Sequence, residues 1–486
     1  MRTAPRARRS NRRLASVGVA TAMVLLSACG TRMSHQAIVA ADGGQTAATL
    51  VQQPGAISSA APGQVPSGPT QSDVSGGAIS GGAGATGMAS TGDSSTTGGS
   101  GSGPTGSVST AGPAGDGSGA RPAPTGAPLV IASVGDYSGI AGASEKDGPK
   151  ALQVWAAWVN DHGGVNGHPV KVYVVDDGMD PQRYQAAVKD LVENKHVVAF
   201  VDNFAPFTVQ AGVKYLESKH VPVIGGDCAE YVWNQSPMLF PQCPSYVSSI
   251  WGIARVGAVF GKGKKFGAII CSEAAACTNT KHEWFDNGLA RKAGVDPVFE
   301  ADVSIGQPDF TAECLDARQA GVQIMSVVAD VGTVGRVVSS CDRQNFHPQY
   351  IQGSGTMDAH LATLPGMSDA LVQLNDFPWT VDNTAVQEFR DAYKTYAPND
   401  PLTPNASQGW ASAIVFQHAA EHVGANPTSA DILAGLWSMR NETFGGLTPP
   451  LTFVRGKPAT DARCSFAMQV QHDVIEAPFG LKTVCR

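Results

Sequence analysis

The stretch LVIASVG at Leu129–Gly135 is a short apolar run ending at a glycine, which is typical of a buried β-strand. A helical pattern of apolar residues follows over Gly148–His162 and ends at a pair of glycines. The next apolar run, Val170–Val175, predicts a second strand that ends in two aspartates. This succession of strand, helix and strand predicts parallel strands joined by a helix that covers the sheet.

The same alternation continues along the chain. It predicts helices and strands in turn over Pro181–Glu193, Val197–Val201, Thr208–Lys219 and Val221–Ile224. After a loop rich in Pro and Cys the rhythm restarts with a helix and continues in turn over Tyr246–Phe260, Phe266–Ile270, Lys281–Ala293, Val298–Val303, Phe310–Ala320, Ile324–Val328, Val334–Arg343 and Gln349–Gln352. Two units of this kind predict a two-lobed α/β protein with a cleft between the lobes. Ligands of open α/β sheets bind beyond the carboxyl ends of the strands.

The part of the chain before this pattern has a different composition. The chain has 486 residues, yet its first aromatic residue is Tyr137, so a packed core begins only near Leu129. Residues 29–127, rich in Gly, Ala, Ser, Thr and Pro, are expected to be a disordered linker. The formal net charge is −7, and the first 28 residues hold six Arg and no acid. The rest of the chain is therefore more acidic, which argues against nucleic acid as a partner.

Residues 1–28 have the pattern of an export signal. Six arginines precede an apolar run over Leu14–Ser27 that is too short to span a bilayer comfortably. The run ends in Leu26-Ser27-Ala28-Cys29, which resembles the bacterial lipobox. The resemblance implies that Cys29 is acylated and becomes the new N-terminus, on the outer face of the cytoplasmic membrane. The alternative is ordinary secretion with cleavage nearby.

The globular part holds eight cysteines, an even number that suggests disulfides in an exported protein. Many pairings are possible, and we expect the sequential one because it closes short loops. The expected pairs are Cys228–Cys243, Cys271–Cys277, Cys314–Cys341 and Cys464–Cys485. A zinc site is the other interpretation, but the chain has no C-x-x-C pair and these spacings match no zinc finger. We therefore expect neither a metal nor a cofactor.

An ordered set of motifs resembles the type I periplasmic binding proteins, and above all the branched-chain amino-acid (Leu/Ile/Val) receptors of ABC transporters. The most specific piece is the stretch VNDHGGVNG at residues 159–167. Other pieces are VGDYSG at 134–139, VVDD at 174–177, VPVIG at 221–225, KFGAII at 265–270, GSG at 353–355 and GGLT at 445–448. The resemblance covers residues 129–475. It implies three chain crossings between the lobes, so that lobe 1 would comprise residues 128–243 and 376–452, and lobe 2 residues 244–375 and 453–486.

The resemblance also implies a ligand site built from loops at strand ends. The candidate ligand-binding residues are Tyr137, Ser138, Asn203, Phe204, Ala205, Asp227, Ala229, Ala276, Asp330, Val331 and Ser354. The chain departs from the family where amino-acid receptors usually bind the ligand head group: Ala229 lacks a hydroxyl and Asp227 adds a charge. The acid that commonly meets the ligand ammonium is not in its usual place, and Asp330 or Asp358 could replace it. The ligand class therefore stays open among amino acids, amines, amides and polyols.

The resemblance implies a lipid-anchored solute receptor, not an enzyme, that closes on a small polar ligand and delivers it to the permease of an ABC importer. One alternative is a ligand sensor or cell-surface interaction protein with the same fold and no import role. Another is a zinc metallopeptidase, because His418-Ala-Ala-Glu-His422 matches the H-x-x-E-H pattern and a helix over Ser412–Val423 would place both histidines on one face. Zinc would need a third protein ligand besides the two histidines, and the only glutamates downstream, Glu442 and Glu476, are not in a predicted helix.

Overall fold

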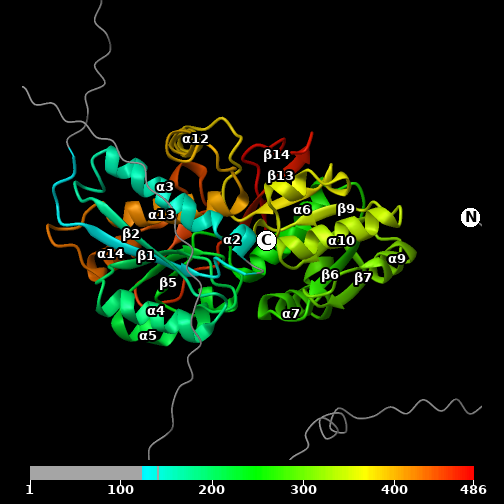
Figure 1. The fold of residues 1–486 in the computed structure, drawn as a ribbon, viewed down its shortest axis with the longest axis horizontal. Helices are drawn as coiled ribbons and strands as arrows, with labels where there is room; N and C mark the ends of the chain where they lie inside the picture. The colour runs from blue at the N-terminus through cyan, green and yellow to red at the C-terminus, as the bar shows by residue number, and fades with distance from the viewer. Residues whose placement is uncertain (1–122, 140–141) are drawn as a thin grey trace, which may run out of the picture. The chain divides into compact units, whose positions relative to one another are not determined.

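The structure, a computed structural model, describes residues 123–139 and 142–486. The predicted signal peptide, the lipidation site Cys29 and most of the predicted linker lie outside these residues. In the described part the chain forms two main β-sheets with helices packed on them (Figure 1). No helix of this part is both long enough and apolar enough to span a membrane.

The first sheet contains five parallel strands in the order β2-β1-β3-β4-β5. Their bounds are β1 Leu129–Gly135, β2 Val170–Asp176, β3 Ala199–Asn203, β4 Val223–Gly226 and β5 Leu239–Phe240. Successive side chains of a strand point to opposite faces. Thus Leu129 and Ile131 enter one apolar cluster, whereas Ala132 and Val134 enter another. Both faces are covered, which explains why the strands are almost continuously apolar.

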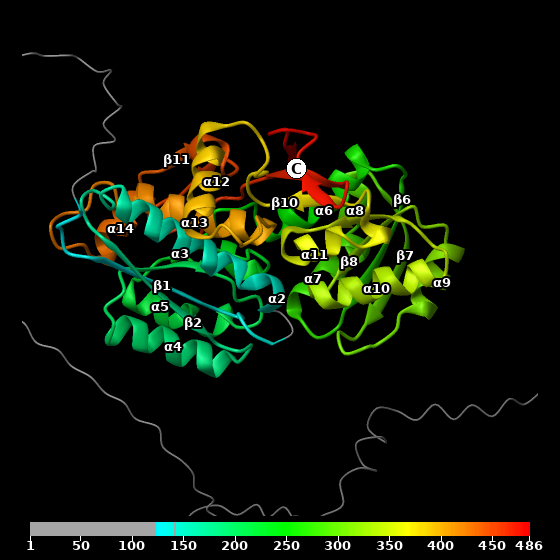
Figure 2. The same ribbon diagram turned by 45° about the horizontal axis from the view of Figure 1, so that its top comes forward.

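Helices α3 (Asp147–Asp161) and α13 (Pro404–Ala419) pack against each other on one face of this sheet, and α4 (Pro181–Glu193) and α5 (Val213–Lys219) cover the other face (Figures 1 and 2). Helices α12 (Thr384–Tyr396) and α14 (Ser429–Leu436) pack on α3 and α13, respectively. Helix α4 begins where the sequence predicted, because Asp180 caps the amides of Gln182 and Arg183 and Pro181 occupies its first turn.

The second sheet is mixed. Its strand order is β14-β13-β10-β9-β8-β6-β7, and β15 pairs with β13. Strands β6 to β9 are parallel as predicted, and β10, which was not predicted, is parallel to β9. Strand β13 runs antiparallel to β10, β14 and β15, which the sequence interpretation did not foresee. The bounds are β6 Lys265–Cys271, β7 Asp296–Val303, β8 Ile324–Val328, β9 Gln349–Gln352, β10 Leu371–Leu374, β13 Cys464–Gln471, β14 Val474–Glu476 and β15 Val484–Cys485. Strands β11 (Arg440–Glu442) and β12 (Leu451–Thr452) form a separate antiparallel pair.

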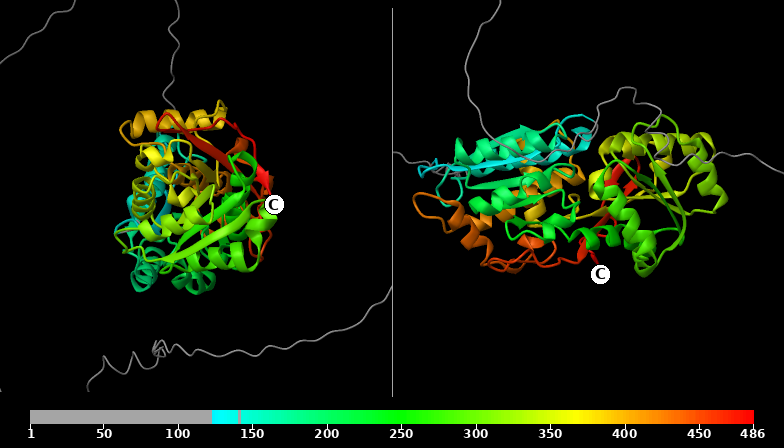
Figure 3. Two further views of the ribbon diagram at one scale, coloured as in Figure 1. Left: turned by 90° about the vertical axis from the view of Figure 1, so that its right-hand side faces the viewer. Right: turned by 90° about the horizontal axis from the view of Figure 1, so that it is seen from below.

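The helices that follow or cover the second sheet are α6 Tyr246–Phe260, α7 Ala275–Lys281, α8 Leu289–Ala293, α9 Thr311–Gln319, α10 Val331–Arg343 and α11 Ala359–Ala362. The short helix α2 (Gly142–Glu145) precedes α3. Because β15 pairs with β13, the C-terminus lies beside the junction of the two groups of elements (Figure 3).

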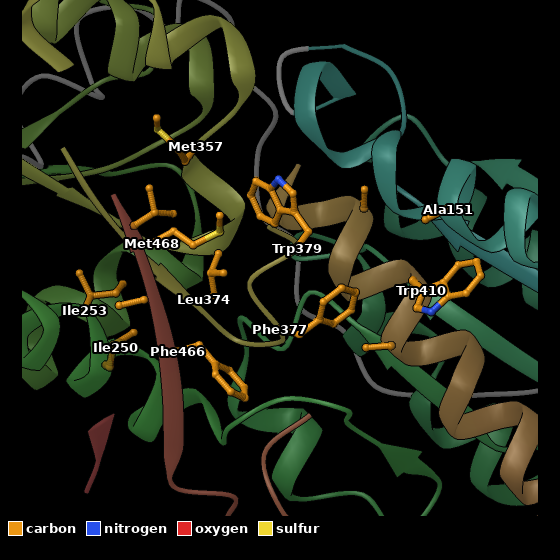
Figure 4. Packing of buried hydrophobic residues seen from close by; sticks show 14 of the residues in the cluster. Ala151, Ile250, Ile253, Met357, Leu374, Phe377, Trp379, Trp410, Phe466 and Met468 are labelled. Carbon is orange, nitrogen blue, oxygen red and sulfur yellow. The ribbon is translucent and has the colours of Figure 1, made fainter. Parts of the chain in front are cut away.

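The chain passes between the two groups three times: between β5 and α6, between β10 and α12, and between β12 and β13. Aromatic rings hold the second passage in place. Phe377 packs edge-to-face against Phe389, with ring centroids 5.2 Å apart, and Phe389 packs in the same way against Trp410 at 5.4 Å. Figure 4 shows Phe377 and Trp379 between Leu374 of β10 and Trp410 of α13. Phe377 is fully buried, so the passage is part of the core.

Three predicted helices differ from the structure. The helix predicted over Lys281–Ala293 is wrong: α7 begins six residues earlier, a π-helical turn follows, and Gly288 at φ 67° separates it from α8. The helix predicted over Thr208–Lys219 is interrupted at Gly212. The helix predicted over Ser412–Val423 is α13, which Thr403 caps at its start and which ends at Ala419.

Four disulfides join Cys228–Cys243, Cys271–Cys277, Cys314–Cys341 and Cys464–Cys485. These are the sequential pairs that the spacing favoured. The first ties the loop after β4 to the first passage between the sheets, and the second closes the loop after β6.

Candidate functional site

A cavity of about 190 Å³ lies among the carboxyl ends of strands from both sheets. The first sheet contributes the loops after β3 and β4, and the second contributes the loops after β6, β8, β9 and β10 together with helix α6. This is the location that the topology of two parallel sheets predicts for a ligand. Cavities for drug-sized molecules are usually about 300–1,000 Å³, so this one is suited to a smaller solute.

Six of the residues singled out from the sequence line this cavity: Phe204, Asp227, Ala229, Ala276, Asp330 and Ser354. They come from both sheets and from positions 150 residues apart, so the fold brings them together. They belong to segments that follow strands, where the family resemblance implied the ligand site.

Five other candidates lie elsewhere. Asn203 is fully buried, and its amide accepts a hydrogen bond from the Val134 amide (3.1 Å) and donates one to the Tyr184 hydroxyl (3.0 Å). It therefore joins β3 to β1 and α4. Ala205 and Val331 are buried and do not line the cavity, and Ser138 is exposed.

Tyr137 lines a different cavity of about 570 Å³ with Lys146, Asp147 and Asp358. Its hydroxyl lies 2.6 Å from the Ser133 hydroxyl. Asp358, which was considered as a replacement for the ammonium-binding acid, caps α11 by accepting a hydrogen bond from the Leu361 amide (2.8 Å). Neither residue lines the 190 Å³ cavity.

The Asp227 carboxylate is held by two backbone amides at the cavity wall. It accepts hydrogen bonds from the Ala205 amide (2.9 Å) and the Ala229 amide (2.6 Å). Burial nevertheless raises the pKa of Asp227, while these two hydrogen bonds act in the opposite direction. The two amides belong to the loops where the family resemblance placed a ligand-binding turn, and here they bind a side chain of the protein itself.

Helix α6 supplies cavity residues that the sequence analysis placed in a helix but did not name as ligand-binding candidates: Tyr246, Ser249, Ile250 and Ile253. The Tyr246 hydroxyl donates to the Ala276 carbonyl (3.0 Å) and lies 2.9 Å from the Thr280 hydroxyl. This fixes the ring at the wall. An aromatic residue at the first position of a helix directly after a chain passage was the available signal.

A network of polar side chains closes the cavity near β10. The Gln373 amide nitrogen donates to Asn375 Oδ1 (3.0 Å), and Asn375 Nδ2 donates to Gln408 Oε1 (3.3 Å). The Ser249 hydroxyl also donates to Asn375 Oδ1 (2.7 Å). The network links α6, β10 and α13, and thus both groups of elements.

Several buried carboxyl groups stand behind the wall on the first sheet. Asp136 is fully buried, and burial together with the neighbouring Asp177 raises its pKa. Burial also raises the pKa of Asp202 to about 8 and that of Asp376 well above its usual value. Each has at least one hydrogen-bond donor within the protein, from Phe207, Ser412 and Gln242 respectively.

The structure lacks the helix on which the zinc-peptidase hypothesis placed both histidines. Helix α13 ends at Ala419, so Glu421 and His422 lie beyond it and the two histidines are not on successive turns of one helix. The His418 Nδ1 atom lies 3.0 Å from the Ile414 carbonyl, and its Nε2 atom lies 3.7 Å from Glu421. Within residues 123–139 and 142–486, no group of three or more His, Cys, Asp or Glu side chains is arranged to hold a metal ion.

The fold and the position of the cavity define a two-lobed, ligand-binding class of α/β proteins. Residues 128–473 match the Periplasmic binding protein family, and the chain belongs to that family. Members of this family are extracytoplasmic substrate-binding proteins, not enzymes.

Individual relatives are distant. An amino acid binding protein of Pseudomonas aeruginosa is 21% identical over 252 residues, which cover 49% of this chain and 64% of that protein. The chain thus spans less than two thirds of that relative's length.

Solved structures show the same fold. A possible leucine/isoleucine/valine-binding protein from Rhodopirellula baltica superimposes with a TM-score of 0.63 at 17% identity, over 74% of this chain and 98% of that one. A fatty acid ABC transporter substrate-binding protein from Thermomonospora curvata gives a TM-score of 0.60 at 19% identity, over 76% and 94% of the two chains. The type I periplasmic binding fold predicted from the sequence is therefore confirmed.

Proposed function

We propose that this protein is a lipid-anchored, extracytoplasmic receptor that closes on a small polar solute, an amino acid or a related compound, and delivers it to an ABC importer. The observation that carries the proposal is the 190 Å³ cavity, whose wall is shared between the carboxyl ends of two α/β sheets. A solute held by both sheets favours the closed state through contacts that the open state lacks.

The proposed lobes are residues 128–243 with 376–452 and residues 244–375 with 453–486. The three passages between the sheets, near Gln242, Asn375 and Phe453, would act as the hinge. Hinge closure is the usual response of two-lobed receptors to their ligand. The closed form would then be the one that the permease recognises.

The names of relatives support a small organic ligand without deciding which one. The Pseudomonas protein is named for amino acids, and the Thermomonospora protein for fatty acids. The present cavity is lined mainly by apolar residues with a few polar side chains, among them Ser354, Thr356 and Asn375. A solute with an apolar body and one polar end satisfies such a wall.

Anchoring would place the receptor beside its importer. Cys29 would carry the lipid, and the linker over residues 29–127 would span roughly 55 Å as a flexible coil. A Cys29→Ala variant is expected to move from the membrane to the soluble fraction after cell disruption. Retention of this variant in the membrane fraction would show that another segment anchors the protein.

Receptor function is tested by a thermal-shift screen of the full-length protein with amino acids, amines, amides, sugars and carboxylates. A true ligand at 100 times its Kd should stabilise the protein by about 2.7 kcal/mol. If no small solute raises the Tm, the proposal is wrong. If a solute binds but no permease subunit co-purifies with the receptor, the alternative role as a ligand sensor is favoured.

A further inference from the structure

The acidic and basic side chains that line the 190 Å³ cavity are all carboxylic acids. Glu145, Asp227, Glu273 and Asp330 line it, and no Lys, Arg or His does so among the described residues. Three of these carboxylates are held by donors of the protein. Besides Asp227, Asp330 accepts hydrogen bonds from the amide (3.1 Å) and hydroxyl (2.5 Å) of Thr333, and Glu273 accepts from Ser304 and Ile305.

Glu145 is different, because its Oε2 atom is buried and has no hydrogen-bond partner among the residues that the structure describes. The acids Asp136, Asp177, Asp227 and Asp330 act on it electrostatically. Burial, followed by the carboxylates of Asp136 and Asp227, raises the pKa of Glu145 well above its usual value. A buried carboxyl group without a donor is costly to a folded protein, so it calls for a partner.

One other buried polar atom of the lining lacks a partner, and it is also an acceptor: Gln373 Oε1. Its orientation is fixed by the network described above, in which the Gln373 nitrogen donates to Asn375. Among the described lining residues, two buried acceptor atoms, Glu145 Oε2 and Gln373 Oε1, therefore lack a donor. A ligand that donates hydrogen bonds would satisfy them.

A ligand carboxylate has little to bind in this cavity. The Ala205 and Ala229 amides already donate to Asp227, so the protein fills with its own side chain the donors that could hold a ligand carboxylate. A second carboxylate would also face the four acids without a cation nearby. Burial of an unpaired charge of this kind is strongly unfavourable.

The remaining wall suits an organic cation with an apolar body. Phe204, Phe207 and Tyr246 line the cavity and offer aromatic surface, to which cations are attracted. Ile250, Ile253 and Val328 supply aliphatic surface.

From these features we infer that the solute is a small amine without a carboxylate, whose ammonium group donates to Glu145 and Gln373 and whose apolar part contacts the aromatic and aliphatic wall. This inference rests on the proposed receptor function, and it narrows the solute class from amino acids and related compounds to amines. Asp227 acts as a specificity residue, since it occupies the amides and repels a carboxylate.

The test compares three compounds of one shape. Isopentylamine, leucine and 4-methylpentanoate share the branched apolar body and differ in their charged groups, and phenethylamine, phenylalanine and 3-phenylpropanoate form a second set. Binding to the full-length protein is measured by isothermal titration calorimetry at pH 7.5. We expect the amines to bind at least tenfold more tightly than the matching amino acids and carboxylates.

Two variants separate a ligand-binding role of Glu145 from a structural one. Glu145→Gln keeps the shape but removes the charge, and it should weaken amine binding at least tenfold while the Tm of the empty protein stays the same or rises. Glu388→Gln removes a charge of the same type from the exposed face of α12. It should change neither amine binding nor the Tm of the empty protein. Unchanged amine binding by Glu145→Gln would overturn the inference.

The outcomes also separate this inference from the proposed function. Tight binding of leucine or phenylalanine with weak binding of the amines would overturn the amine assignment and leave the receptor function intact. Binding of neither these compounds nor any solute of the thermal-shift screen would overturn both.

Discussion

The Asp227 carboxylate accepts a hydrogen bond from the Ala205 amide, 22 residues earlier in the chain, at 2.9 Å. It thereby joins the loops that follow β3 and β4 at the cavity wall. The same carboxylate also binds the Ala229 amide, so a single side chain saturates donors from both loops. The specificity of the cavity depends on what these two amides are free to bind.

Removal of the Asp227 side chain should shift the preference of the cavity toward amino acids. In Asp227→Ala the Ala205 and Ala229 amides become available to a ligand carboxylate, and one negative charge leaves the wall. A hydrogen bond to a charged group contributes about 1.5–3 kcal/mol, so the ratio of leucine affinity to isopentylamine affinity should rise at least tenfold. Calorimetric titration of both compounds into wild type and variant measures this ratio.

Asp227→Asn provides the graded control, because its single carbonyl oxygen still accepts from one amide. The ratio for this variant should fall between those of wild type and Asp227→Ala. An unchanged ratio in both variants would contradict a role of Asp227 in specificity. Urea unfolding of each variant shows whether the fold has been retained.

Stability of the empty protein should fall as the pH rises. Burial raises the pKa of Asp147 to about 6, of Glu230 to about 7 and of Asp202 to about 8. A carboxyl group with a raised pKa in the folded state binds more protons when folded than when unfolded. Its stabilising contribution is therefore complete below about pH 4 and is lost as the pH rises through the folded-state pKa. We expect the Tm to fall by several degrees between pH 5 and pH 8.

Asp202→Asn tests the largest of these three contributions. Asp202 has φ 61°, in the left-handed region that Asn adopts more readily than most residues, so the backbone should be retained. The amide does not titrate, and the dependence of Tm on pH should become flatter between pH 5 and pH 8. A slope identical to that of the wild type would show that Asp202 is ionised in the folded protein throughout this range.

The sequence predicted the elements whose ends are marked locally. Strands β8 and β9 and helices α4 and α6 have the predicted bounds, because caps, prolines and apolar runs delimit them. Helices α7 and α8 were misassigned because the break depends on the left-handed Gly288 and on a disulfide that starts α7 early. No periodicity in the sequence reports either constraint.

Cavity residues that follow the ends of strands were predicted from the sequence. Cavity residues whose position depends on tertiary contacts were missed. Phe204, Asp227 and Asp330 follow strands, at positions where the family resemblance implied ligand-binding loops. Tyr246 and Glu145 belong to helices α6 and α2, and only the three-dimensional packing shows that these helices reach the cavity. Asn203 also follows this topology, but its amide satisfies Val134 and Tyr184 inside the core, which only the three-dimensional packing reveals.

Affinity for an amine should rise with pH. Glu145 has a raised pKa in the empty cavity, where Asp136, Asp177, Asp227 and Asp330 act on it electrostatically. It must lose its proton to pair with an ammonium group, whereas an amine keeps its own proton up to about pH 10. The Kd for isopentylamine should therefore fall by up to about tenfold for each unit by which the pH rises, between pH 5 and the pKa of Glu145.

Proton release on binding gives an independent measure of this linkage. Calorimetric titrations in buffers of different ionisation enthalpy should show release of up to one proton for each amine bound. In Glu145→Gln both the release and the pH dependence should be much smaller. If amine binding still releases a proton in this variant, that proton comes from another acid of the cavity. Asp227 is then the first candidate.

Two of the disulfides within the second half of the fold should have separable roles. Cys314–Cys341 closes a loop of 27 residues on α9 and α10, away from the cavity, whereas Cys271 and Cys277 both line it. In the chain-entropy account, the longer loop contributes about 3–4 kcal/mol and the six-residue loop about 2 kcal/mol. The double variant Cys314→Ala/Cys341→Ala should therefore lose more stability than Cys271→Ala/Cys277→Ala, as measured by urea unfolding.

Ligand affinity should follow the opposite order. The Cys271–Cys277 bond holds the loop that carries Ala274 and Ala276 at the cavity wall, so its removal frees that loop and adds an ordering cost to binding. We expect the Kd for isopentylamine to rise severalfold in Cys271→Ala/Cys277→Ala and to stay within twofold of wild type in Cys314→Ala/Cys341→Ala. Equal loss of affinity in the two variants would mean that global destabilisation, and not the loop after β6, controls binding.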